Sequence, residues 1–172
     1  MKRKGDKQDG FTLIEILLYL SISVVMIALI GSIGVNVLLD VMGSRAKEEL
    51  HYNVQFAGEK IRLLTSQAES VLEPIQASTS SVLVLKMEDP NNDPTVIDVI
   101  DGRIRVQEGM SEPEILSGEN IFVSTVEFLN VSRGDEVGSL RLVLGMRVLN
   151  PGNRTELQSS TTLYTTMNLQ YP

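Results

Sequence analysis

Three residues near the start of the chain have the types and spacing for proteolytic processing followed by charge pairing. Gly10 ends a short basic stretch, Phe11 begins an apolar run, and Glu15 is an acid at the fifth position of that run. In an ordinary secretory signal the small residue of the cleavage site follows the apolar region, whereas Gly10 precedes it. Cleavage after Gly10 would therefore keep the apolar run on the mature chain and create a new α-amino group at Phe11.

The apolar run is long enough to cross a membrane. Residues 16 to 39 are 24 positions without a formal charge, and about 20 apolar residues span a bilayer. An ionised Glu15 in this setting costs at least about 2.5 to 3.5 kcal/mol on insertion scales. When such helices bundle, the protonated Phe11 amine of one subunit and the Glu15 carboxylate of its neighbour can neutralise each other. The same pairing would set the axial register between neighbouring helices.

The charges that flank this run predict its orientation. The first ten residues hold four basic and two acidic side chains, which gives them a net charge of +2. Because the whole chain has a net charge of −7, residues 11–172 have a net charge of −9. Positive charge collects on the cytoplasmic side of a membrane span. We therefore expect residues 1–10 to be a cytoplasmic leader that is removed. Residues 11–41 are predicted to form a single transmembrane helix, with the rest of the chain extracytoplasmic.

Apolar spacing predicts that the helix continues past the membrane. Apolar residues recur at steps of four and three, as one face of an amphipathic helix does; they are Leu50, Val54, Ala57, Ile61, Leu64, Ala68 and Val71. Pro74 provides a stop. Residues 42–73 are thus predicted as an amphipathic continuation of the helix that ends near Leu72.

Residues 74–172 change to the two-residue alternation of β-strands, which indicates an extracytoplasmic sheet domain. Six segments have this pattern: 81–86, 95–100, 103–107, 121–131, 139–149 and 155–169. The helix face described above is the long apolar surface available to cover one side of the sheet. The fold class expected is α+β, with one long N-terminal helix packed on an antiparallel β-sheet.

Two turns are predicted within this sheet. Asp101-Gly102 between alternating segments is a strong signal for a two-residue hairpin. It pairs Val99 with Ile104 on the apolar face and Asp98 with Arg105 on the other face. A second turn is expected at residues 150–153, where Pro and Gly fit the central positions of a type II turn.

The string Gly10-Phe11-Thr12-Leu13-Ile14-Glu15, with its basic leader and its span, resembles the processing site of type IV prepilins and of type II secretion pseudopilins. In that superfamily a prepilin peptidase cuts after the Gly and methylates the new N-terminal Phe, and assembly depends on the Glu. The resemblance implies cleavage between Gly10 and Phe11, N-methylation of Phe11 and an assembly role for Glu15. It also implies a pilin-like fold, in which residues 11–41 are the polymerisation helix and are held in the inner membrane before assembly.

The partners that the resemblance implies are other pilins or pseudopilins of one filament, the prepilin peptidase and the inner-membrane assembly machinery. The C-terminal half, with long alternating strands and no Cys pair, is similar to J-type minor pseudopilins and W-type minor pilins. Many major pilins carry a Pro in the membrane half of the helix, and this chain has none there. A minor subunit is therefore favoured over a major one.

Composition argues against several other functions. The chain has no Cys and a lone His51, so it offers no thiol nucleophile, disulfide or histidine cluster for zinc. No Ser/His/acid constellation stands out, and Pro90 and Pro94 interrupt the oxygen-rich loop at 89–93 that would otherwise suit calcium. We expect no enzyme, no cofactor and no metal. The acidic body also makes nucleic acid an unfavourable partner.

Two alternatives to a structural filament subunit remain at this stage. A membrane-tethered adhesin or DNA-uptake module at a filament tip would be favoured by a basic cluster on one sheet edge, from Arg103, Arg105, Arg141 or Arg147. An exported enzyme could use the small-residue site at 44–46 as a signal cleavage site. The overlong apolar run disfavours this second alternative.

Overall fold

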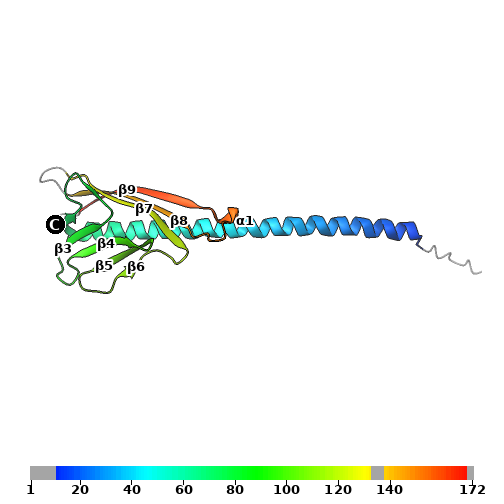
Figure 1. Cartoon of the computed structure of the whole chain (residues 1–172), viewed down its shortest axis with the longest axis horizontal. Helices are drawn as coiled ribbons and strands as arrows, with labels where there is room; N and C mark the ends of the chain where they lie inside the picture. Colours follow the sequence, from blue (N-terminus) through cyan, green and yellow to red (C-terminus); the bar gives the residue numbers. More distant parts are fainter. Residues whose placement is uncertain (1–10, 133–137, 170–172) are drawn as a thin grey trace, which may run out of the picture. The chain divides into compact units, whose positions relative to one another are not determined.

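A computed structural model describes residues 11–132 and 138–169 (Figure 1). One helix precedes all of the strands, as predicted. The elements in chain order are α1 (Leu13–Gln67), β1 (Ala68–Glu73), β2 (Thr79–Ser80), β3 (Leu83–Met87), β4 (Thr95–Ile100), β5 (Arg103–Glu108), β6 (Glu114–Ile115), β7 (Ile121–Asn130), β8 (Ser139–Val148), the 3-10 helix η1 (Thr155–Leu157) and β9 (Ser160–Asn168). The chain divides into two units, Met1–Val41 and Met42–Pro172, which are described separately below.

The first unit contains the apolar part of α1. Its most apolar 18-residue stretch has a mean hydropathy of 2.6, and none of that stretch is buried. Large apolar side chains are exposed along the whole of this part of α1, for example Leu13 at 79% near its start and Leu38 at 63% near its end. A helix of this length and composition can span a bilayer, and in water it would leave its whole apolar surface uncovered.

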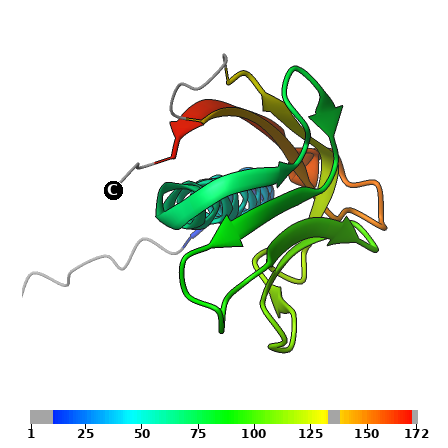
Figure 2. The same ribbon diagram turned by 90° about the vertical axis from the view of Figure 1, so that its left-hand side faces the viewer.

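The second unit is built around the C-terminal part of α1, which lies between two antiparallel sheets (Figure 2). One sheet has the order β1-β3-β4-β5-β6 and the other the order β2-β7-β8-β9. The α+β fold class is confirmed, but the prediction of a single sheet is wrong. Two-residue alternation identifies the apolar face of each strand but not its neighbours, and apolar strand faces can cover a helix from two sides as well as from one.

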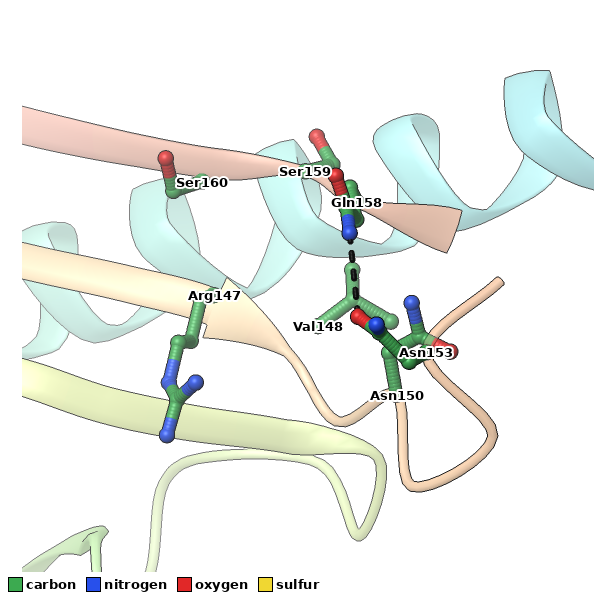
Figure 3. A pocket seen from close by; sticks show the side chains of 7 residues that line it. All are labelled: Arg147, Val148, Asn150, Asn153, Gln158, Ser159 and Ser160. Carbon is green, nitrogen blue, oxygen red and sulfur yellow. Dashed lines mark hydrogen bonds between the residues drawn. The ribbon is translucent and has the colours of Figure 1, made fainter. Parts of the chain in front are cut away.

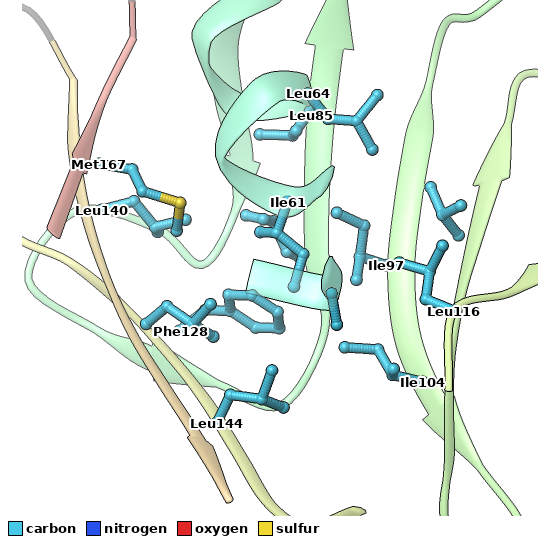
Figure 4. Close-up of a cluster of buried hydrophobic side chains, with 14 of the residues drawn as sticks. Ile61, Leu64, Leu85, Ile97, Ile104, Leu116, Phe128, Leu140, Leu144 and Met167 are labelled. Atoms are coloured by element: carbon cyan, nitrogen blue, oxygen red, sulfur yellow. The ribbon is translucent and has the colours of Figure 1, made fainter. Parts of the chain in front are cut away.

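The core joins the helix face to both sheets (Figure 4). Ile61 of α1, Ile97 of the first sheet and Phe128 of the second are each fully buried. The predicted helix face is confirmed for its first five members, since Leu50, Val54, Ala57, Ile61 and Leu64 are all buried. Burial of each large aliphatic side chain contributes about 1.5 to 3 kcal/mol, so this face is a major source of the unit's stability.

The predicted end of the helix near Leu72 is wrong, because α1 ends at Gln67 and β1 follows at once. In β1, Ala68 is buried and Val71 packs against the core, as the helical spacing required. Register shifts against β3 occur between Ala68 and Ser70 and between Val71 and Glu73. A bulge lets residues three apart share one face of a strand, so a spacing that looks helical is satisfied by an irregular strand that pairs with β3.

The hairpin predicted at Asp101-Gly102 is confirmed. Val99 lies opposite Ile104 and Asp98 opposite Arg105. Asp101 and Gly102 both have positive φ, 53° and 71°, as a type I′ turn requires. Ile104 is fully buried, while Asp98 and Arg105 form an ion pair on the partly exposed face.

The second turn exists, but the type II prediction is wrong. The Asn153 amide donates to the Asn150 carbonyl at 3.0 Å. A type II turn requires a positive φ at Gly152. Gly152 does not have one, whereas Asn153, the next residue, has a φ of 47°. The Asn150 side chain also bonds both backbone groups of Arg154, which widens the loop. As a result η1 occupies 155–157, and the last strand begins at Ser160 rather than at Thr155.

Gly102 should be essential to the hairpin, whereas Gly152 should not. A Cβ at Gly102 would require a strained φ and would overlap the Phe122 ring, but a Cβ at Gly152 would meet only the Arg154 side chain at 3.7 Å. We expect Gly102→Ala to lower the free energy of unfolding by about 1 to 3 kcal/mol, and Gly152→Ala to leave it nearly unchanged. Urea unfolding of the detergent-solubilised chain, followed by circular dichroism, measures both. Equal losses in the two variants would contradict the proposed role of the turn.

Candidate assembly site

The start of α1 is capped by the residue that follows Phe11. The Thr12 carbonyl accepts hydrogen bonds from the amides of Glu15 and Ile16, at 3.1 and 3.2 Å. The Thr12 hydroxyl oxygen also accepts from the Glu15 amide, at 3.4 Å. This is the N-cap position, where Thr is favoured because it satisfies amides that have no helical partner. The cap places Glu15 in the first helical turn, where the helix dipole favours a negative charge.

Glu15 is flanked by two aromatic side chains of its own chain. The Tyr19 hydroxyl donates to Glu15 Oε1 at 3.4 Å. The Phe11 and Tyr19 rings meet edge to face, with centroids 6.4 Å apart and an interplanar angle of 75°. Glu15 is partly buried, although its neighbours in sequence are exposed, Phe11 at 72% among them. Tyr19 therefore links the two residues, since its hydroxyl bonds Glu15 and its ring contacts Phe11.

The remaining polar groups near the start of the helix are satisfied within it. The hydroxyls of Ser21 and Ser23 donate to the carbonyls of Leu18 and Tyr19, each at 2.8 Å. Such back-bonding lets Ser sit in an apolar environment without an unpaired donor. Glu15 differs from these serines because a charge needs a compensating charge, and its hydrogen-bond donor, Tyr19, is neutral.

Two glycines of the same helix are open to close approach by another helix. A Cβ placed on Gly31 or Gly34 would meet nothing within 4 Å. Neither glycine is therefore required by a contact within the described part of the chain. Small residues on an exposed apolar helix are a common feature of helix-helix contacts in membranes, because they let two backbones approach closely.

The structure places two of the three predicted site residues. Phe11 and Glu15 lie close together at the start of α1, both beside Tyr19. Gly10 and the rest of the leader, 1–10, lie outside the described residues. Sequence reasoning missed Tyr19, although its spacing of four from Glu15 puts both side chains on the same helix face.

Comparison with known families agrees with this geometry. Residues 5–31 match the family described as the prokaryotic N-terminal methylation motif. The chain carries the signature of type IV pilins and pseudopilins. No curated protein and no solved structure matches it. The match includes Gly10, Phe11 and Glu15, and confirms the resemblance drawn from those residues. Pilins and pseudopilins are structural rather than catalytic proteins, and they assemble with one another after processing by a prepilin peptidase.

The four arginines considered as a nucleic-acid site are divided between the two sheets of this pilin-like chain. Arg103 and Arg105 lie on β5, whereas Arg141 and Arg147 lie on β8. Arg105 is bonded to Asp98 at 2.6 Å, and this hydrogen bond raises the pKa of Arg105 above its ordinary value. The Arg147 guanidinium lies over the Phe122 ring, 4.7 Å from its centroid. Two of the four candidate cations are thus already engaged within the second unit, Arg105 by Asp98 and Arg147 by the Phe122 ring.

The oxygen-rich loop at 89–93 uses its carboxylates to hold its own backbone. Asp89 Oδ1 accepts from the amide and the side chain of Asn91, both at 2.9 Å, and Asp93 Oδ1 accepts from the Met87 amide at 3.0 Å. The bond from the Asn91 amide to Asp89 is that of an Asx-turn, and the bond from the Met87 amide ties Asp93 to the end of β3. Within the described ranges, 11–132 and 138–169, no cluster of three or more His, Cys, Asp or Glu side chains is arranged to hold a metal ion.

A surface cavity of about 360 Å³ lies at the second turn (Figure 3). Apart from Val148 its lining residues are of polar types, and the lining comprises Arg147, Val148, Asn150, Asn153, Gln158, Ser159 and Ser160. The Gln158 side chain donates to Asn153 Oδ1 at 3.1 Å, and Asn150 is bonded to the backbone of Arg154. Three of its polar side chains thus stabilise the loop itself. The start of α1 remains the candidate functional site.

Proposed function

We propose that this pilin or pseudopilin is a minor structural subunit of a type IV pilus or a type II secretion pseudopilus. The observation that carries the proposal is the position of the methylation motif at the start of an exposed apolar helix. Such a helix requires lipid before assembly and neighbouring helices after it. The minor assignment is supported by the absence of Pro from residues 11–41 and by the long alternating strands of a C-terminal half without Cys.

The membrane stage of this function depends on the leader. The basic residues at 2–7 hold the N-terminus in the cytoplasm, and the apolar helix crosses the inner membrane once. The second unit, with its own buried core, then lies outside the cytoplasm. Prepilin peptidase cuts between Gly10 and Phe11 and methylates the Phe11 amine. The cut removes the basic leader and leaves a cationic amine at the start of the helix.

The assembly stage depends on charge neutralisation. A mature subunit has a positive amine on Phe11 and a negative carboxylate on Glu15, both at an apolar helix start. Contact between one subunit's amine and a neighbour's carboxylate removes two uncompensated charges from the helix bundle in one step. Because the carboxylate position along α1 is defined by the Thr12 cap and the first turn, this contact also sets the axial offset between neighbours.

Processing should depend on Gly10 alone among the glycines of the leader. We expect the wild-type mature chain to begin at Phe11 and to carry the added mass of one methyl group. Gly10→Val should leave the precursor uncut, because a β-branched side chain does not fit a site that selects a small residue. Gly5→Val, the same change upstream in the leader, should be processed normally. Mass spectrometry of the N-terminus reads all three. A wild-type terminus at Lys47, or at Met1 in cells with active peptidase, would refute the processing proposal.

Incorporation into filaments should require the Glu15 charge. Glu15→Ala leaves the neighbour's amine unpaired among apolar helices, and Glu15→Gln keeps the shape but not the charge, so both variants should be nearly absent from sheared filaments. The second unit should remain folded in both, since its core lies within residues 42–172. The measurement is each variant's ratio of sheared to membrane-bound protein.

Glu48→Gln is the matched control for this experiment. Glu48 is an exposed acid of the same helix and lies in the second unit, so its loss should leave incorporation unchanged. Cleavage after Gly10 should persist in every variant at position 15, because the cut bond lies upstream. Normal incorporation of both Glu15 variants would move the function towards a membrane-tethered module.

A further inference from the structure

We propose that Tyr19 is a positioning residue for assembly: its hydroxyl holds the Glu15 carboxylate in the orientation in which a neighbouring subunit's N-terminal amine can reach it. This inference rests on the proposed function, and it adds a role for a residue outside the motif string at 10–15. Three observations support it, namely the hydrogen bond to Glu15, the ring contact with Phe11 and the partial burial of Glu15.

The first step concerns what Tyr19 needs. Its hydroxyl lies three residues inside the uncharged run that begins at Ile16, where water is scarce and an unpaired donor is costly. Within the described residues, Glu15 is the acceptor that bonds this hydroxyl. Each group therefore reduces the other's cost in the apolar environment. A Phe at position 19 would fill the same space without any polar cost, so the hydroxyl is a liability unless the bond is used.

The second step concerns what the bond leaves available. At 3.4 Å the contact is long for an O–H···O hydrogen bond. An ionised carboxylate offers about four acceptor sites on its two oxygens, and Tyr19 occupies one of them. The carboxylate can thus keep Tyr19 and accept an ammonium group at the same time. Tyr19 limits the rotation of the Glu15 side chain, which lowers the entropy that the intermolecular ion pair must otherwise lose.

The third step concerns Phe11. The Phe11 and Tyr19 rings meet edge to face. Tyr19 therefore contacts both Glu15, which is proposed to supply the negative charge, and Phe11, which is proposed to become the N-terminal residue. Edge-to-face aromatic pairs contribute modestly beyond area burial and have a preferred geometry. Tyr19 therefore orders the side chain of the terminal residue as well as the carboxylate, and both halves of the proposed intermolecular contact are pre-oriented by one residue.

The decisive variant is Tyr19→Phe, which keeps the ring contact and removes the hydroxyl. We expect its ratio of sheared to membrane-bound protein to fall about three- to tenfold relative to wild type, as for the loss of one modest hydrogen bond. Ser23→Ala is the matched control. It also removes a hydroxyl from α1, but the Ser23 hydroxyl donates to a backbone carbonyl, that of Tyr19, and not to Glu15. That control should incorporate normally. Incorporation of Tyr19→Phe at the wild-type level would overturn the proposal.

A double-mutant cycle separates positioning from a general role of Tyr19 at the membrane interface. Glu15→Asp keeps the charge but withdraws it by one methylene, out of reach of the Tyr19 hydroxyl. Adding Tyr19→Phe to Glu15→Asp should then change incorporation by less than about twofold. An equal fall in both backgrounds would mean that Tyr19 acts as an interfacial anchor, and would reject the positioning role. Complete failure of Glu15→Asp alone, together with a reduced Tyr19→Phe, supports the proposal, because charge without position is then insufficient.

The failure of this inference and of the proposed function give different results. If Glu15→Gln incorporates normally, the assembly role of the carboxylate itself is wrong, whatever Tyr19 does. If Glu15→Gln fails while Tyr19→Phe is normal, only the positioning role is wrong. In both cases N-terminal mass spectrometry of the same samples shows whether cleavage after Gly10 has occurred, so a processing defect is not mistaken for an assembly defect.

Discussion

The fold of the second unit depends on one contact, the packing of two sheets on a single face of α1. Ala57 and Ile61 are completely buried at the middle of this face, and Phe128 is the largest of the fully buried side chains in the core that they share. Loss of this contact would uncover the inner faces of both sheets at once. Since each sheet alone has an uncovered apolar face, the helix supplies what neither sheet can supply to itself.

The same helix has a second requirement at its other end, where a carboxylate lies among apolar side chains. The helix face between residues 50 and 64 is buried by the sheets of the same chain. The Glu15 carboxylate, by contrast, has no cationic partner among the described residues. Within the described residues its side-chain hydrogen-bond donor is the neutral Tyr19, which supplies no compensating charge. A self-sufficient core and an unsatisfied helix start agree with a subunit that folds alone and functions in an assembly.

The sequence was a good guide wherever a signal was local. The Asp101-Gly102 hairpin was predicted with its register, because a two-residue turn with positive φ determines which residues face each other. The sequence was a poor guide where the spacing of apolar residues fits both a helix and a bulged strand. Ala68 and Val71 fit a helical spacing, yet they lie in β1, where bulges produce the same three-residue spacing and pairing with β3 supplies the backbone hydrogen bonds.

The amino-acid sequence by itself determined the apolar span, the basic N-terminal stretch, the motif from Gly10 to Glu15 and the apolar face of each element, because these follow from composition and period along the chain. Tertiary structure decided the division of the strands into two sheets, the end of α1 at Gln67 and the engagement of Arg147 by the Phe122 ring, since these depend on which strands pair across long stretches of sequence. It also brought Tyr19 into contact with both Glu15 and Phe11, because only folded side-chain conformations show which neighbours on one helix face touch.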